Sequence, residues 1–105
     1  MLDRLTYEDF ENFRGKTFTL EGIGGQVEMQ LLDVRRSPYS GLPSQRQPFA
    51  ILFTAPATPG LANQMYNIRH PGRGLIEGIF ITPVLPPPQF IQQTREIRFY
   101  EAIFN

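Results

Sequence analysis

The residues Phe99-Tyr100-Glu101-Ala102-Ile103-Phe104-Asn105 form the stretch that decides the fold class. Aromatic and β-branched side chains follow one another here with few polar residues between them, which is typical of a β-strand. Because chain ends fray unless they are tied into the structure, we expect this strand to be paired and packed against a core. Apolar side chains on both of its faces favour a compact, closed β-domain.

The first half of the chain repeats the strand pattern. Polar and apolar residues alternate over 16–21 and again over 26–31, and Gly22-Ile23-Gly24-Gly25 between them predicts the turn of a hairpin. The alternation slips by one residue at Leu31-Leu32-Asp33-Val34, which predicts a β-bulge. The continuous apolar run over 49–54 predicts a strand that is buried on both faces at the centre of the core.

A second hairpin is predicted further along. Residues 64–70 and 75–82 have strand patterns on either side of the turn Pro71-Gly72-Arg73-Gly74. Gly78 inside the longer strand predicts a bend. We expect the prolines between Pro83 and Pro88 to end that strand, because proline has no N–H to donate to a ladder.

One short helix is predicted near the start of the chain. Thr6 and Asp9 stand at the spacing of a capping box, and Gly15 is placed to end the helix. Phe10 and Phe13 would then pack together on the sheet.

These elements, with a last strand over roughly 95–104, predict a mainly β fold. The chain of 105 residues is long enough for one domain, which we assign to residues 1–105. Strands at this spacing, mostly joined as hairpins, favour a small antiparallel β-barrel or a two-layer sandwich of about six strands with one short N-terminal helix.

Composition limits the classes of protein to be considered. The sequence is 41% apolar and 19% charged, and no apolar run approaches the ~20 residues of a membrane helix, so we expect a globular protein that does not span a membrane. Met1-Leu2-Asp3-Arg4 lacks the layout of a secretory signal, so a cytoplasmic location is expected. The absence of cysteine excludes disulfides and thiolate sites.

The charges are unevenly distributed although the net charge is zero. Residues 1–34 carry seven acids and three bases, whereas residues 35–75 carry five arginines and no acid. One interpretation is an arginine surface that binds an acidic partner, such as the N-terminal segment of a second copy. The alternative is that these arginines pair with acids of neighbouring strands in the same chain, or face solvent.

Two aromatic residues, Tyr39 and Phe90, lie in proline-rich loops where core packing does not require them. They could anchor an interface or fold back over the sheet ends. The candidate interface residues are Arg35, Arg36, Tyr39, Arg46, Arg69, Arg73 and Phe90.

The chain has few of the residues that catalysis needs. Its one histidine, His70, adjoins the Pro-Gly turn and is interpreted as a structural or exposed turn residue, and without cysteine or a second histidine no ordinary zinc site can form. Glu77 and Glu101 interrupt apolar strands, and solvent-facing strand positions explain them better than a catalytic carboxylate pair. No catalytic residue, metal ligand or cofactor site is predicted, and we expect a protein that is not an enzyme.

Nucleic-acid binding is not favoured either. Domains that bind nucleic acids usually carry a net positive charge, whereas the pI here is about 6.6 and no nucleic-acid-binding motif is present.

Several stretches resemble one small bacterial family catalogued only as a domain of unknown function. They are Leu5-Thr6-Tyr7-Glu8-Asp9-Phe10, Gly15-Lys16-Thr17-Phe18, Pro48-Phe49-Ala50-Ile51-Leu52-Phe53, Gln64-Met65-Tyr66-Asn67-Ile68-Arg69-His70-Pro71 and Tyr100-Glu101-Ala102-Ile103-Phe104-Asn105. The resemblance covers nearly the whole chain, and none of its motifs is a catalytic signature. Relatives in that family are often encoded beside proteins resembling phage tail-collar or tail-fibre domains, so the resemblance implies a part in a tail-like or fibre-like assembly. The chain departs from the family between Leu85 and Thr94, where relatives have a shorter polar turn in place of Pro86-Pro87-Pro88.

Two hypotheses follow for the function. The first is a non-enzymatic structural or adaptor domain that binds a protein partner or itself, located in the cytoplasm or in an assembled tail-like particle. The second is a small-ligand-binding or catalytic barrel with a mouth lined by Tyr66, Arg69, His70 and Arg73.

Overall fold

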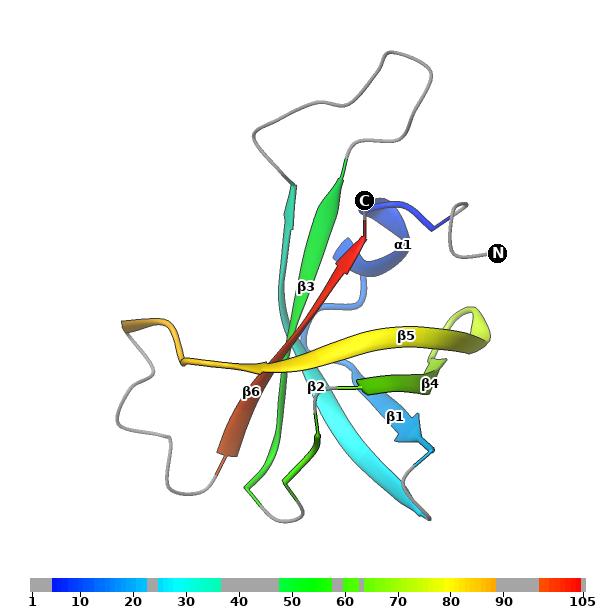
Figure 1. Ribbon diagram of the computed structural model, residues 1–105. Helices are drawn as coiled ribbons and strands as arrows, with labels where there is room; N and C mark the ends of the chain where they lie inside the picture. Colours follow the sequence, from blue (N-terminus) through cyan, green and yellow to red (C-terminus); the bar gives the residue numbers. More distant parts are fainter. Residues whose placement is uncertain are drawn as a thin grey trace.

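The structure is a computed structural model that describes residues 5–22, 25–36, 48–57, 60–62, 64–88 and 97–104. The elements within these residues are α1 (Glu8–Glu11), β1 (Thr17–Glu21), β2 (Gln26–Arg36), β3 (Phe49–Pro56), β4 (Gln64–His70), β5 (Gly74–Val84) and β6 (Ile97–Phe104). The strands form a closed barrel in the order β1-β2-β3-β6-β5-β4, and every neighbouring pair is antiparallel (Figure 1). The prediction of a mainly β fold with six strands and one short helix is confirmed, and of the two forms considered the sheet takes the barrel.

Two irregularities predicted from the sequence bend the sheet. The register between β2 and β3 shifts between Leu31 and Asp33, where the apolar pattern slips. Gly78 has a φ of +71° and lies where the register between β4 and β5 shifts. The side chain of Asn67 stabilises this bend, because its Oδ1 accepts a hydrogen bond of 3.0 Å from the backbone N–H of Gly78.

The second hairpin strand ends within the Pro83–Pro88 segment, as expected, but two residues later than the predicted range 75–82. Strand β5 continues through Pro83 to Val84, and Pro83 lies opposite Tyr100 of β6. Strand β4 pairs with β5 no further than Ile81, so beyond that point β6 is the only described neighbour of β5. Proline is tolerated at such a position because a strand that is paired on one side only does not need every backbone N–H as a donor.

Strand β3 is buried on one face rather than on both. Phe49, Ile51 and Phe53 are buried inside the barrel, whereas Ala50, Leu52 and Thr54 between them are only partly buried on its outer face. The last strand is described from Ile97 to Phe104, and residues 95 and 96 of the predicted range lie outside the described residues.

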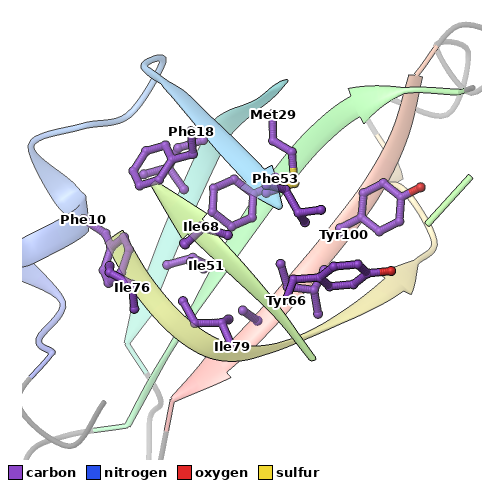
Figure 2. Close-up of a cluster of buried hydrophobic side chains, with 14 of the residues drawn as sticks. Phe10, Phe18, Met29, Ile51, Phe53, Tyr66, Ile68, Ile76, Ile79 and Tyr100 are labelled. Carbon is purple, nitrogen blue, oxygen red and sulfur yellow. The ribbon is translucent and has the colours of Figure 1, made fainter. Parts of the chain in front are cut away.

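The barrel interior is filled with side chains that point inward from the strands, so it is a packed core (Figure 2). On β6, Tyr100, Ala102 and Phe104 belong to this core, whereas Ile103 points outward and is 63% exposed. Packing of this kind supplies most of the stability of a small domain without disulfides. The largest fully buried side chains include Phe10, Phe18, Phe49, Phe53, Leu20, Met29, Ile51, Ile68, Ile81 and Tyr100.

Helix α1 covers one end of the barrel, beside the last residues of β6 (Figure 1). The Phe10 ring is fully buried, and its centroid lies 5.6 Å from that of Phe104 and 5.8 Å from that of Phe49. Half of the predicted capping box is present, because an Asp9 carboxylate oxygen accepts a hydrogen bond of 2.8 Å from the backbone N–H of Thr6. The predicted packing of Phe10 on the sheet is therefore confirmed.

Candidate protein-interaction surface

Four of the arginines proposed as interface residues pair with carboxylates of the same chain. The Nε of Arg35 lies 2.9 Å from a carboxylate oxygen of Asp33, and the Nε of Arg69 lies 2.6 Å from one of Glu21. The Nη1 of Arg73 lies 3.3 Å from a carboxylate oxygen of Asp9, and Arg36 contacts Glu8. This is the internal pairing considered as the alternative from the sequence. The other three candidate interface residues, Tyr39, Arg46 and Phe90, lie outside the described residues.

Two of these arginines contact the acidic N-terminal segment of their own chain. Arg36 pairs with Glu8, and its guanidinium lies 4.1 Å from the centre of the Tyr7 ring. Arg73 pairs with Asp9 from the turn between β4 and β5. The charge asymmetry along the sequence is therefore largely neutralised within the fold, and these side chains fasten α1 to the barrel. A contact of the four arginines with a partner stays a prediction.

His70 also holds the helix. Its side chain is 3% exposed, and its Nε2 donates a hydrogen bond of 2.6 Å to the backbone carbonyl of Asp9, since a carbonyl oxygen can only accept. Its Nδ1 accepts hydrogen bonds from the backbone N–H groups of Gly72, at 2.9 Å, and Arg73, at 3.1 Å. The ring also packs edge-on against three phenylalanine rings, those of Phe10, Phe13 and Phe18. Both nitrogens are thus occupied by backbone groups, so His70 is a structural residue, and it is buried rather than exposed.

The mouth proposed for a ligand-binding or catalytic barrel is not assembled. Arg69 points outward from β4 to Glu21, whereas Tyr66 and His70 are buried. Tyr66 and His70 lie four residues apart on the same strand, which separates them by roughly 13 Å.

Tyr66 and Tyr100 close the barrel end opposite Phe10 (Figure 2). The Tyr66 hydroxyl donates a hydrogen bond of 2.7 Å to the carbonyl of Ala62, and the Tyr100 hydroxyl accepts one of 3.1 Å from the N–H of Leu61. Burial raises the pKa of the Tyr66 hydroxyl above its usual 10.0; the Ala62 hydrogen bond opposes this shift and nearby Tyr100 adds to it.

Three of the exposed large apolar side chains lie on the neighbouring strands β4, β5 and β6, and we call them the outer patch: Met65, Phe80 and Ile103. Met65 and Phe80 are a cross-strand pair on β4 and β5, 58% and 51% exposed, and Ile103 on β6 is 63% exposed. Phe80 and Ile103 each lie two residues from the pair formed by Thr82 and Glu101, on the side where β5 and β6 separate. Phe80 and Ile103 therefore lie on either side of the point where the pairing of β5 with β6 ends.

A groove of about 270 Å³ lies beside the outer patch, on the outer face of β3 and β6. Its floor contains Leu52 of β3, which stands between Asp33 of β2 and Glu101 of β6 in the ladder. One wall is the end of β5 and the proline segment that follows it. The lining residues are Asp33, Arg35, Ala50, Ile51, Leu52, Val84, Leu85, Pro87, Pro88 and Glu101.

Neither the outer patch nor the groove was predicted from the sequence. The alternation along β4 does place Met65 on the face opposite Tyr66 and Ile68, and this signal could have identified it as an outward-facing apolar residue. The groove depends on the order β2-β3-β6-β5, which brings together residues from four strands. No local pattern encodes that order.

Neither a membrane-spanning helix nor a metal site is found in the described part of the chain. None of its helices is long and apolar enough to cross a membrane. Nor does it contain a group of three or more His, Asp or Glu side chains that could hold a metal ion.

Comparison with known proteins identifies a family and no function. No curated protein and no solved structure is significantly similar to the chain. The family described as "Domain of unknown function (DUF6916)" matches residues 5–104, which include the helix, all six strands, the outer patch and the groove. The chain therefore belongs to this family of domains of unknown function.

Proposed function

We propose that the protein is a non-enzymatic structural or adaptor domain that binds another protein through the outer patch. The observation that carries this proposal is the exposure of Met65, Phe80 and Ile103, each more than half accessible to solvent on adjoining strands. Large apolar side chains that gather on an outer surface are typical of protein interfaces, whereas singly scattered ones need no explanation.

The interior of the barrel supports a binding role for the outer surface. The core side chains fill the space between the strands, and the two ends are covered by Phe10 and by the pair Tyr66 and Tyr100. The one histidine is engaged by backbone groups on both ring nitrogens. The one histidine is therefore committed to structure, whereas the side chains of the outer patch are apolar and accessible.

The narrower form of the proposal places the domain in a bacterial tail-like or fibre-like assembly. It is supported by the resemblance of the motif residues described above, and it is compatible with a cytoplasmic protein that is later incorporated into a particle. In such an assembly the outer patch would contact a neighbouring protein of the fibre or tail, or a second copy of the chain.

A comparison of variants tests the proposal. The protein and a Met65→Ser/Phe80→Ser variant are immobilised side by side and exposed to native lysate of the source cells, and the retained proteins are identified by mass spectrometry. We expect a partner that wild type retains and the variant loses, and a tail-like or fibre-like partner would support the narrower form. Sedimentation velocity of wild type and of the same variant, over a range of protein and salt concentrations, tests whether the patch mediates self-association.

The control is Leu75→Ser, which changes another exposed apolar residue of β5 that lies outside the patch. It should retain the same partner as wild type. The double variant should fold, because an exposed cross-strand pair contributes only about 0.2–1 kcal/mol. A wild-type protein that is strictly monomeric and retains no partner would refute the proposal, as would a double variant that binds like wild type.

A further inference from the structure

We infer that the groove beside the outer patch binds a basic side chain, arginine or lysine, of the partner protein, with Glu101 as the group that pairs with its charge. This inference rests on the proposed function, because it names the chemistry of the segment that the partner presents. It depends on a different surface and a different residue from those that carry the proposal itself.

The charges of the groove are not equally compensated. Asp33 lies 2.9 Å from the Nε of Arg35 and 3.4 Å from the Nη2 of Arg14, so two cations surround it. It also accepts a hydrogen bond of 2.9 Å from the N–H of Val34. Glu101 has no ion pair or hydrogen bond to its side chain from any part of the chain that the structure describes, although it is partly buried. The groove therefore offers one uncompensated negative charge.

The walls around Glu101 suit the stem of a long basic side chain. Glu101 stands between Leu52 of β3 and Thr82 of β5 in the ladder, and Val84 lies on the same wall. Leu85 at the rim is 90% exposed, and Pro87 and Pro88 follow it. Arginine and lysine bury their methylene stems along apolar surface while their charged heads remain near polar groups. A volume of about 270 Å³ accommodates one such side chain.

An anionic partner fits less well. Arg35 is the cation that lines the groove, and its charge already pairs with Asp33. An anion entering the groove would leave Glu101 unpaired and would add a second like charge beside it. Charge complementarity thus favours a cationic group.

A titration with a minimal probe tests the inference. n-Butylguanidinium, which carries the head and stem of arginine, is added to ¹⁵N-labelled protein at low ionic strength, and amide shifts are followed by NMR. We expect saturable millimolar binding with the largest shifts at Leu52, Val84 and Glu101, and Glu101→Gln should weaken it by about fivefold or more, as a partly buried ion pair of about 1 kcal/mol implies. Butyrate, with a similar stem and the opposite charge, should give no saturable shift there.

Glu28→Gln is the matched control, since Glu28 is an exposed acid on the outer face of β2 away from the groove. It should bind the probe like wild type. Shifts spread over all surface carboxylates, an affinity unchanged by Glu101→Gln, or contacts in the free protein between the Leu52 methyls and another part of the same chain would each overturn the inference. The Met65→Ser/Phe80→Ser variant should still bind the probe, so failure of the groove and failure of the outer patch can be distinguished.

Discussion

His70 and Asp9 are 61 positions apart in the sequence, yet the His70 Nε2 lies 2.6 Å from the backbone carbonyl of Asp9. This hydrogen bond joins the end of β4 to the helix that covers the barrel. The same ring accepts two hydrogen bonds from the turn that follows β4, so one side chain fixes the helix, the strand end and the turn together. Its contribution is structural, and it can be measured.

We expect His70→Phe to lower the free energy of unfolding by about 2–4 kcal/mol. The phenyl ring keeps the volume among Phe10, Phe13 and Phe18 but removes the partner of the Asp9 carbonyl and of the Gly72 N–H. The Arg73 N–H keeps only its hydrogen bond of 3.3 Å to the His70 carbonyl. Urea unfolding gives the change in stability, and amide hydrogen exchange at Phe10 shows whether the helix is released. A variant as stable as wild type would mean that water replaces these hydrogen bonds without cost.

Removal of the Phe10 ring, which fills one end of the barrel, should lower the free energy of unfolding more than His70→Phe does. We expect Phe10→Ala to cost about 3–5 kcal/mol, since a fully buried phenylalanine leaves a cavity when it is truncated. Phe13→Ala is the control, because Phe13 is only partly buried and packs on one face of His70. Thermal or urea unfolding should therefore rank Phe10→Ala well below Phe13→Ala, and equal losses would contradict the assignment of Phe10 as the central plug.

Position 72 requires glycine because a neighbouring ring leaves no room for a side chain, and not because of its backbone conformation. A Cβ atom built at Gly72 would lie 2.5 Å from the Cζ of Phe13, so Gly72→Ala must push this ring off His70. We expect a loss of about 1 kcal/mol in unfolding free energy, within the range typical of overpacking. Gly60→Ala, where a Cβ meets nothing within 4 Å, should be neutral.

A double-mutant cycle separates this contact from other effects of the alanine. In a Phe13→Ala background the same Gly72→Ala change should cost almost nothing, because the clashing ring is gone. Additive effects of the two substitutions would show that the strain lies elsewhere.

The raised pKa of Tyr66 predicts that the stability of the protein depends on pH in the alkaline range. The pKa of this hydroxyl is raised in the folded state above 10.0, so the folded protein holds this proton more tightly than the unfolded chain does. The resulting stabilisation is fully present below pH 10 and is lost as the pH rises through the folded-state pKa. We expect Tyr66→Phe to decline less steeply in stability above pH 10 than wild type, measured by urea unfolding at a series of pH values. Identical slopes would show that the hydroxyl does not titrate differently on folding.

The strands were predictable because each barrel strand has an inner and an outer face. Alternation of apolar and polar residues identified both hairpins, and its slip at Leu31 identified the bulge. Burial of His70 was missed, although Tyr66, Ile68 and His70 fall on one face of β4 and that face is the interior. The neighbouring Pro-Gly turn suggested exposure, whereas the helix folds back over the end of the strand and covers it.

The candidate site was not predictable in the same way. The arginine-rich segment was visible as charge along the chain, but its partners Glu8, Asp9 and Glu21 come from distant positions. The docking of α1 brings Glu8 and Asp9 near, and the pairing of β1 with β4 brings Glu21 near. The groove likewise needs the β3 to β6 pairing, and Glu101 looks like any solvent-facing acid until Leu52 and Thr82 are placed on either side of it. Strand order is a long-range property, and it decides both surfaces.

The order of the strands also has a consequence for the kinetics of folding. The β4–β5 ribbon joins the rest of the barrel through two short seams, three residue pairs with β1 and three with β6. The seam with β1 joins residues as distant in sequence as Thr19 and Arg69, so its loop-closure entropy must be overcome before its contacts contribute. We therefore expect the four-stranded sheet β1-β2-β3-β6 and the ribbon to form separately and to dock late. Substitutions at the seam with β1 should then accelerate unfolding far more than they slow folding.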